Sequence, residues 1–406
     1  MFNFTESEEQ KRMIEQATEI MNKYVYPNEK YMVPHRGLPE EILKSLQQIV
    51  KEKGLWAGHL PKELGGMGMG FVSLGLLSEV IGQSPIGPYV FGSMAPDAGN
   101  GEILVHAANE EQKEKYLKPL ANYDVRSCFA MTEPGVSGSD PRTLLGTAVK
   151  DGDEWVINAH KWYTTGAEGA AFTIAMVVTD PDADPHHRTS LFIVETDNPG
   201  FEIVREVPVM GDHYPGGHCE VRFNNCRIPA KNLLGKRGEG FKLAQLRLGP
   251  GRITHAMRWL GVARRSLNEM IAYSLTKKDG EKTLADSQTI QNYIADSEAE
   301  IQASRLLTLQ AAWKMDQGDQ ARKEVSLIKL YGAHMLNNVL DRAIQTLGMY
   351  GVSSNTPLEG LLREARAARI YDGADEVHRM VVARQVLKEF QLKERLHEPT
   401  TITQKS

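Results

Sequence analysis

The chain contains little of what marks a disulfide-rich, metal-binding or membrane protein. Its 406 residues include three cysteines, Cys128, Cys219 and Cys226. An odd number of cysteines without CxxC spacing argues against a disulfide framework or a zinc site, and it favours small buried side chains. No apolar run approaches the roughly 18 residues of a membrane-spanning helix, so no membrane partner is expected.

Two further absences concern targeting and charge. The polar, acidic start of the chain lacks the apolar segment of a signal peptide and the arginines of a transit peptide, which predicts a reduced, cytoplasmic location. The formal net charge is −5, without a long block of like charge. A nucleic-acid partner is therefore not expected, because binding to a phosphate backbone requires a strongly basic patch.

The length and local patterns predict several units, since 406 residues are too many for one small core. Residues 1–125 have a helical pattern, and Ser7 with Gln10 predicts a capping box at the first helix. Residues 126–235 contain short β-prone runs separated by turn clusters. Without long helices between them, these strands are expected to be antiparallel, in a barrel or sandwich.

Residues 236–395 return to a helical pattern. An apolar stripe formed by Val325, Ile328, Met335 and Val339 suits a helix bundle. The last residues, 396–406, are polar and are expected to form a disordered tail. The sequence thus predicts an α+β multidomain protein in which a β-domain stands between two helical domains.

Two segments of the β zone suit a flat, polar ligand. Residues 131–140 (MTEPGVSGSD) form a Gly/Ser-rich loop whose N–H groups and hydroxyls could hold a ring edge or a phosphate, or form a well-capped turn. Trp162 is followed two residues later by Thr164. An indole face beside a hydroxyl suits a heterocycle, although a tryptophan among strands is usually a core residue.

Seven motifs occur in the order and spacing of one family, at residues 54–68 (with PKELGGMG at 61–68), 131–140, 161–164 (KWYT), 221–235, 238–241 (GEGF), 345–351 and 371–373 (YDG). On these residues the chain resembles the acyl-CoA dehydrogenase family over nearly its whole length. The resemblance implies an N-terminal helical domain, a middle β-domain and a C-terminal four-helix bundle. It also implies FAD, with the isoalloxazine between the last two domains.

The resemblance further implies which residues hold the cofactor. The residues that would contact the FAD of their own subunit are Phe129, Met131, Thr132, Ser139, Trp162, Thr164, Ala374 and Glu376. Trp162 would stack on the ring, and Thr164 would bond near its N5. Gln345 and Gly348 would approach the diphosphate of an FAD in a neighbouring subunit, which implies a homodimer or homotetramer. The usual Arg-x-x-Phe-Gly motif is missing, and Lys277 stands in its arginine place.

The reaction implied by the resemblance is α,β-dehydrogenation of an acyl-CoA, with electrons passed to an electron-transfer flavoprotein. A carboxylate removes the α proton while hydride leaves the β carbon for the flavin. The family's usual glutamate is replaced by Asp372, and the position where a minority of members place the base is Gly251. Asp372 is the predicted base; Glu376 as the base, and a helix-capping role for Asp372, are the alternatives.

The candidate substrate-binding residues are Arg252, His255, Arg258 and Gly373. Arg252 keeps the register of an arginine that is associated with CoA in the family. Residues 249–258 and 372–378 resemble a subgroup in which some members are fused to a kinase-like domain. This implies acyl-CoAs with an oxygen function further along the chain, which His255 and Arg258 could face; a core-edge histidine and a salt-bridged arginine are the simpler interpretation.

Two other functions fit the same scaffold. A flavin oxidase similar to nitroalkane oxidase would also use an aspartate base, whereas the retained Arg252 favours a dehydrogenase. A non-catalytic flavin-binding homologue would be expected to lack Asp372 or Trp162, and both are present.

Overall fold

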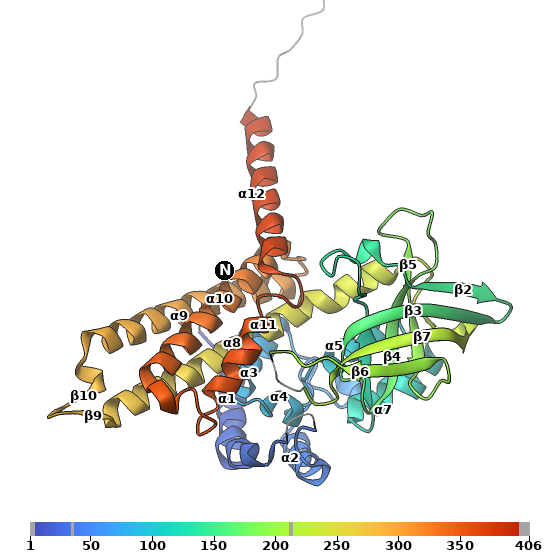
Figure 1. Ribbon diagram of the computed structural model, residues 1–406. Helices are drawn as coiled ribbons and strands as arrows, with labels where there is room; N and C mark the ends of the chain where they lie inside the picture. The colour runs from blue at the N-terminus through green and yellow to red at the C-terminus, as the bar shows by residue number, and fades with distance from the viewer. Residues whose placement is uncertain (1–4, 34–35, 211–213, 398–406) are drawn as a thin grey trace, which may run out of the picture.

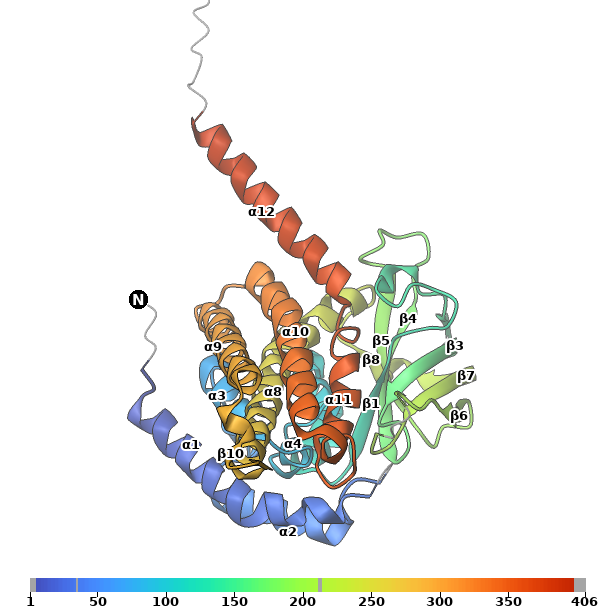
Figure 2. The same cartoon turned by 60° about the vertical axis from the view of Figure 1, so that its left-hand side comes forward.

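The structure is a computed structural model that describes residues 5–33, 36–210 and 214–397 (Figures 1 and 2). Its first zone is helical, with α1 (Glu8–Ile20), α2 (Glu40–Glu52), α3 (Phe71–Ile81), α4 (Gly87–Val90), α5 (Asp97–Ala107), α6 (Glu110–Gln112) and α7 (Lys118–Asn122). Ser7 Oγ accepts from the N–H of Gln10 at 3.2 Å, and Gln10 Oε1 accepts from the N–H of Ser7 at 2.9 Å. The predicted capping box is confirmed.

The middle zone is an eight-stranded sheet of order β6-β7-β3-β2-β4-β5-β8, with β1 beside β4. Its strands are β1 (Arg126–Ala130), β2 (Thr147–Asp151), β3 (Glu154–Thr165), β4 (Ala170–Val178), β5 (Thr189–Glu195), β6 (Phe201–Glu206), β7 (His218–Pro229) and β8 (Leu233–Leu234). Most pairs are antiparallel, as expected. However, β1 runs parallel to β4, and Thr147 of β2 pairs in parallel with Val178. The expectation of an antiparallel sheet is wrong for these two pairs. The chain passes through β2 and β3 before it enters β4, and this long connection allows β4 to run parallel to β1.

Two cores cover the two faces of this sheet. On one face, Trp155 and Phe192 pack within the curved sheet, together with all three cysteines, which are buried and free. On the other face, Ile174 and Leu191 pack against Leu104 of α5 and other residues of the helical zone. Because β4 and β5 lie between both cores, they are almost continuously apolar rather than alternating.

The third zone contains the long helices α8 (Gly240–Thr276), α9 (Gln288–Asp316), α10 (Arg322–Leu347), α11 (Leu358–Ala367) and α12 (Asp375–His397), with a small ribbon of β9 (Lys278–Asp279) and β10 (Lys282–Thr283). Val325, Ile328, Met335 and Val339 are buried, so the predicted stripe is confirmed. One core joins α8–α11 to the N-terminal helices. Helix α8, 37 residues long, reaches from this core to β5 and links bundle and sheet (Figure 1).

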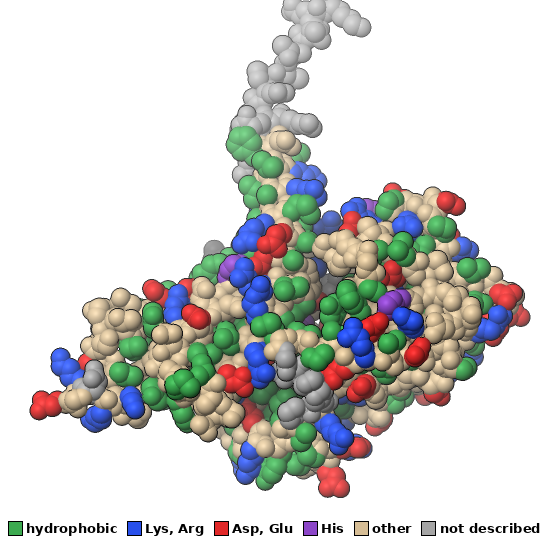
Figure 3. Space-filling view, in the orientation of Figure 1, with side chains coloured by type: hydrophobic (Ala, Val, Ile, Leu, Met, Phe, Trp, Pro, Cys, Tyr) green, Lys and Arg blue, Asp and Glu red, His purple; other side chains and the backbone are tan. Residues whose placement is uncertain are grey.

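Helix α12 projects away from the body of the chain (Figures 1 and 2). Apolar side chains lie exposed along it, as the green atoms of Figure 3 show: Met380, Val386, Leu387, Phe390 and Leu392. Elsewhere on the face in Figure 3, acidic and basic side chains are interspersed. The tail expected at 396–406 lies outside the described residues, except that its first two residues belong to α12. Of the helices in the described part of the chain, none combines the length and apolar character needed to cross a membrane.

Candidate active site

Asp372 lies in a tight turn between α11 and α12. Its φ is +54°, in the left-handed region, which aspartate enters more readily than most residues. Gly373 follows with φ +100°, and a Cβ there would lie 2.8 Å from His378 Nε2. The Tyr371–Gly373 motif therefore folds as a turn that requires a glycine at its third position.

Side-chain donors hold the backbone of this turn from two helices. Arg252 Nε of α8 and His378 Nε2 of α12 each lie 3.2 Å from the carbonyl oxygen of Asp372. The pKa of His378 falls to about 4, mainly because of burial, so its ring is neutral at pH 7 and can donate through Nε2. The carbonyl of Asp372 is thus fixed, and its side chain remains available for other contacts.

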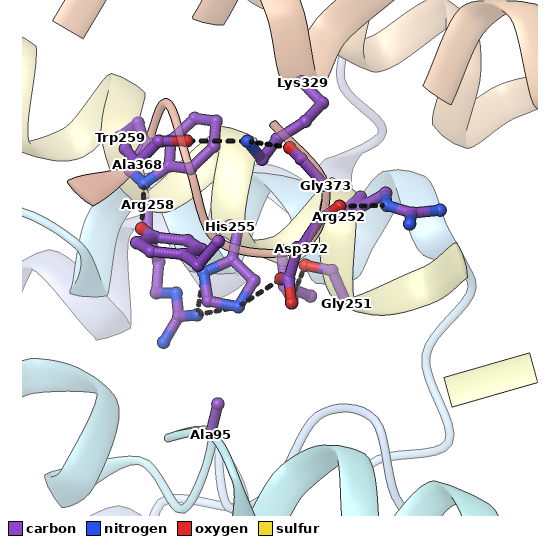
Figure 4. A network of polar contacts seen from close by, with 12 residues as sticks. Ala95, Gly251, Arg252, His255, Arg258, Trp259, Lys329, Ala368, Asp372 and Gly373 are labelled. Atoms are coloured by element: carbon purple, nitrogen blue, oxygen red, sulfur yellow. Dashed lines mark hydrogen bonds and ion pairs between the residues drawn. The ribbon is translucent and has the colours of Figure 1, made fainter. Parts of the chain in front are cut away.

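Lys329 of α10 holds the backbone of the same turn (Figure 4). This lysine is fully buried, and its Nζ donates to the carbonyl oxygens of Ala368 at 2.6 Å and Gly373 at 3.1 Å. Nζ also lies 5.5 Å from the ring centroid of Trp259 and 5.7 Å from that of Tyr371. Burial lowers the pKa of Lys329 to about 8, so it is still mostly charged at pH 7.

The carboxylate of Asp372 faces His255. Nε2 of His255 lies 3.4 Å from Asp372 Oδ2, and the two side chains are 20% and 23% exposed. Arg258 Nη2 lies 2.8 Å from Nδ1 and 3.3 Å from Nε2 of the same ring. Arg258 is buried, and its Nη1 lies 3.3 Å from Met94 Sδ. Because α12 begins only at Asp375 and the carboxylate faces His255, Asp372 is not the cap of that helix.

Positive charge gathers around this carboxylate. Burial alone would raise the pKa of Asp372, but the electrostatic effects of His255, Arg247, Arg252 and Lys329 outweigh it, so the pKa lies below its ordinary value. The pKa of His255 itself is lowered to about 3, first by burial and then by a neighbouring arginine, so the ring is neutral at pH 7. The three cations therefore carry the effect and keep Asp372 ionised at neutral pH.

Arg247 was not singled out from the sequence. Its guanidinium lies 4.5 Å from the ring centroid of Phe129, and its Nε donates to Asn100 Oδ1 at 3.2 Å. Through Phe129 it connects the surroundings of Asp372 with the start of the sheet. Nearby, burial raises the pKa of Glu102 to about 8. The only signal in the sequence was one basic residue in the run 243–251 (LAQLRLGPG), which no motif marks.

Six of the residues expected to hold the flavin lie on β1, on β3 and in the loop between β1 and β2. The N–H of Trp162 donates to the carbonyl of Thr132 at 3.0 Å, so the two predicted segments lie side by side. Trp162 is half-buried, with its ring centroid 4.8 Å from that of Tyr163. The hydroxyl of Thr164 is buried and lacks a hydrogen-bond partner in the described part of the chain. Such an orphaned donor beside an indole fits a ligand with polar ring atoms, and hence a flavin.

A buried lysine of the KWYT motif, Lys161, anchors the loop. Lys161 is fully buried, and its Nζ donates to the carbonyls of Met131 at 2.9 Å and Met176 at 2.6 Å, and to Glu133 Oε1 at 2.7 Å. Glu133 also accepts from the N–H of Gly146 at 2.9 Å. Burial lowers the pKa of Lys161 to about 8. Ser139, further along the loop, is exposed and lies 3.0 Å from Ser137 through their hydroxyl oxygens.

Three predicted cofactor residues lie elsewhere in this chain. Lys277, Gln345 and Gly348 are exposed at the opposite end of α8 and α10, where Tyr273 and Tyr350 stack with centroids 6.0 Å apart. About 25 residues of helix separate Lys277 from Arg252, which corresponds to nearly 40 Å. Within one chain these residues do not meet Asp372. Ala374 adjoins the turn, while Glu376 is 79% exposed and lies 3.5 Å from a basic residue of α12.

Family profiles cover almost the whole chain. The N-terminal, middle and C-terminal domains of acyl-CoA dehydrogenase match residues 7–124, 128–226 and 238–387. The order of helical, β and helical zones is that of this class of oxidoreductase. So are the turn that carries Asp372 in the bundle and the Trp162 and Thr164 side chains on the sheet. The chain belongs to the acyl-CoA dehydrogenase family. The predicted family, fold class and enzyme class are confirmed, and FAD is the cofactor that goes with them.

Particular relatives extend this comparison. The chain is 42% identical over 348 residues to the protein named probable acyl-CoA dehydrogenase FadE2 of Mycobacterium tuberculosis, covering 84% of this chain and 85% of that one. It is 39% identical to acyl-CoA dehydrogenase family member 10 of Mus musculus over 96% of its own length, but spans only 38% of that protein.

Solved structures agree. An acyl-CoA dehydrogenase homologue from Mycobacterium abscessus superposes with a TM-score of 0.90 at 39% identity, over 95% of this chain and 100% of that one. Butyryl-CoA dehydrogenase from Megasphaera elsdenii superposes with a TM-score of 0.82 at 26% identity, over the same shares of the two chains.

Proposed function

We propose that the chain catalyses α,β-dehydrogenation of an acyl-CoA, with Asp372 removing the α proton. The observation that carries the proposal is a single carboxylate, fixed in a left-handed turn and kept ionised by Arg247, Arg252 and Lys329. Trp162 and Thr164 would hold FAD, which would supply the acceptor for the hydride from the β carbon. The similarity to a butyryl-CoA dehydrogenase supports an acyl-CoA as the substrate.

Asp372 must hold a proton at its carboxylate after taking it from carbon. Its low pKa keeps it ionised before substrate arrives but makes it a weak base. An acyl chain that displaces water would raise the pKa and strengthen the base. The thioester carbonyl also needs a hydrogen-bond donor. Among the described residues no backbone acceptor takes the N–H of Asp372, so this N–H is available to the carbonyl.

The substrate-binding roles of Arg252, His255, Arg258 and Gly373 belong to the same proposal. Polar groups stand near the base, including the buried Arg258 and the half-buried Arg247. These donors favour an acyl chain that carries an oxygen function over a plain hydrocarbon chain, because an apolar chain would leave them without partners.

Self-association and electron transfer complete the proposal. Lys277, Gln345 and Gly348 lie beside exposed apolar side chains at the far end of the bundle, including Met349, which is 82% exposed. Exposed apolar surface of this kind marks sites of association between proteins. It supports a homodimer or homotetramer in which a second subunit covers this end and these residues meet the neighbour's FAD. An electron-transfer flavoprotein is the proposed acceptor, and the cytoplasm the proposed location.

An anaerobic titration tests the function. Purified protein with its FAD is mixed with plain and hydroxylated acyl-CoAs, and the flavin absorbance at about 450 nm is followed. Bleaching is expected with at least one thioester, and the hydroxylated series should bleach at lower concentration. If no thioester bleaches the flavin, while small nitroalkanes cause oxygen consumption, the chain is an oxidase of the same fold.

A further inference from the structure

Asn100 of α5 lies at the centre of a chain of hydrogen bonds between three zones of the molecule. Its side chain is fully buried, and its Nδ2 donates to Ser127 Oγ at 2.9 Å and to the carbonyl of Cys128 at 3.1 Å. Its Oδ1 accepts from Arg247 Nε at 3.2 Å. Ser127 Oγ in turn donates to Asp97 Oδ1 at 2.8 Å. The chain therefore runs from Arg247 on α8 to the buried carboxylate of Asp97 on α5.

The chemistry of the partners fixes the direction of each hydrogen bond in this chain. A backbone carbonyl only accepts, so the Asn100 atom that faces it is the amide nitrogen. A guanidinium only donates, so the atom that faces Arg247 is the amide oxygen. Asp97 is paired with Arg126 at 2.6 Å and only accepts, so Ser127 donates to it and is left to accept from the amide. A flipped amide would set acceptor against acceptor and donor against donor, so the side chain of Asn100 has one orientation.

The guanidinium of Arg247 is also held by its packing. Its Cζ lies 4.5 Å from the ring centroid of Phe129. A Cβ at Gly99, next to Asn100, would lie 3.0 Å from Arg247 Nε and 3.3 Å from Cζ. The guanidinium thus occupies the space that a side chain at residue 99 would take. Arg247 forms no ion pair with a described residue, so its charge acts over a longer range.

The carboxylate on which this charge acts most is that of the proposed base. Arg247 and His255 are eight residues apart, on the same face of α8. Nε2 of His255 lies 3.4 Å from Asp372 Oδ2. Burial lowers the pKa of Arg247, and nearby carboxylates oppose this effect. Asp372 contributes most to that opposition, ahead of Glu102 and Asp97.

We propose that Asn100 is a positioning residue that holds the guanidinium of Arg247 beside the proposed base, Asp372. The inference rests on the proposed function in taking Asp372 as the base. An arginine side chain has many rotamers, and the fixed acceptor at Nε together with the Phe129 ring selects one of them. Without the amide, the guanidinium is free to turn toward water, where the solvent weakens its effect on a carboxylate. Asn100 acts on the base through Arg247.

A double-mutant cycle tests this role. In FAD-loaded protein labelled with ¹³C-aspartate, the carboxyl of Asp372 is assigned by its loss in Asp372→Asn, and its pKa is measured. Arg247→Met should raise this pKa by roughly one unit, the lower end of the effect of a nearby opposite charge. Asn100→Leu should raise it by a smaller amount. Adding Asn100→Leu to Arg247→Met should raise it no further, because the amide acts through the guanidinium.

Two matched variants control for general loosening and for loss of charge. Gln47→Leu removes another buried side-chain amide, which donates to the carbonyl of Tyr89 at 3.0 Å in the N-terminal helical zone. Arg264→Met removes another arginine of α8, which is paired with Glu298 outside the site. Both variants should leave the pKa of Asp372 at its wild-type value.

Gly99→Ala provides a second approach that does not depend on the folding of Asn100→Leu. Alanine favours a helix over glycine, so this variant should fold. Its Cβ would crowd the guanidinium of Arg247 while the amide of Asn100 stays in place. The pKa of Asp372 should rise in Gly99→Ala, but the same change should have no effect in the Arg247→Met background.

The outcomes separate the two proposals. A pKa of Asp372 that stays at its wild-type value in Asn100→Leu and Gly99→Ala, or in whichever of them folds, overturns the positioning role. An equal rise with and without Arg247→Met, or an equal rise in Gln47→Leu, also overturns it, even if an acyl-CoA bleaches the wild-type flavin. Conversely, if no acyl-CoA bleaches the wild-type flavin, the proposed function fails, while the cycle still decides whether Asn100 acts on Asp372 through Arg247.

Discussion

Two buried lysines anchor the two walls of the site in different ways. Lys161 in the sheet and Lys329 in the bundle are both fully buried, and burial lowers the pKa of each to about 8. Lys161 is paired with the buried carboxylate of Glu133. Lys329 has no carboxylate within hydrogen-bond distance among its described contacts, and it donates to the carbonyls of Ala368 and Gly373.

The difference shows how charge is distributed over the site. On the sheet side, the charge of Lys161 is balanced locally, which suits a wall that only has to hold a loop in place. On the bundle side, Lys329 adds to Arg247 and Arg252 around the carboxylate of Asp372, and it is also within the electrostatic reach of Asp375. Three cations act on the carboxylate of Asp372, so the function of this wall depends on where that negative charge lies.

The largest expected effect comes from removing that negative charge. Asp372→Asn should keep FAD but slow bleaching of the flavin by an acyl-CoA about 10²- to 10⁴-fold, the usual contribution of a positioned base. Stopped-flow absorbance measures the rate, and the flavin spectrum gives the FAD content. Bleaching at the wild-type rate would place the base elsewhere.

On the sheet side, Lys161→Met should cost stability rather than chemistry. The variant leaves Glu133 buried without a cation, which typically costs about 3–5 kcal/mol of unfolding free energy. Denaturant unfolding of the FAD-loaded protein measures it, and the added change Glu133→Gln should recover part of the loss. A cost below about 1 kcal/mol for Lys161→Met would mean that the pair is hydrated in solution.

Lys329→Met should cost less than Lys161→Met, about 1–3 kcal/mol, because it leaves two carbonyls without donors but no buried charge. The same unfolding experiment ranks the two variants. An equal or larger loss for Lys329→Met would contradict the contrast between the two walls.

The pH dependence of Lys329 sharpens that comparison. Its pKa is about 8 in the folded chain against an ordinary value of 10.5, so between these values the unfolded chain binds more protons. The wild type should therefore gain unfolding free energy relative to Lys329→Met as the pH rises from 8 to 10.5, by at most about 3 kcal/mol. This gain in unfolding free energy should be lost as the pH falls through 8. A flat difference between pH 8 and 10.5 would show that Lys329 titrates normally.

The smallest expected effect concerns Thr164. Its buried hydroxyl has no partner among the described residues, so Thr164→Val should leave the FAD-free protein as stable or up to about 1 kcal/mol more stable. In the FAD-loaded protein the same change should cost about 1 kcal/mol if the hydroxyl bonds the flavin. Thermal unfolding with and without FAD compares the two states, and equal shifts in both would remove Thr164 from the cofactor site.

Much of the fold could be predicted because helical and strand periodicities differ strongly between the zones. The parallel pairing of β1 with β4 could not, since pairing depends on how the chain crosses the sheet and not on the pattern of one strand. Motif register placed Arg252, His255 and Arg258 on one helix. The structure brings Arg252 and His255 to Asp372, more than 110 residues away in the chain, and Arg258 to His255.

Lys329 and Arg247 were not predicted because nothing local distinguishes them, and the motif that contains Lys161 does not show that its ammonium group is buried. Lys329 stands in the run EVSLIKLY, where a lysine would ordinarily reach solvent; the turn at 368–373 packs over it and makes it buried. Arg247 likewise gains its place from Phe129 and Asn100, which lie in other zones of the chain. Contacts between distant segments decide such residues, and motifs do not record them.

The left-handed conformation of Asp372 also bears on how this site could have changed over time. Aspartate and asparagine enter that region at lower cost than glutamate, so the turn and the identity of the base are linked. A glutamate in this turn would occupy the same left-handed conformation at a higher backbone cost. The shorter aspartate is therefore the acid that suits the backbone of this turn.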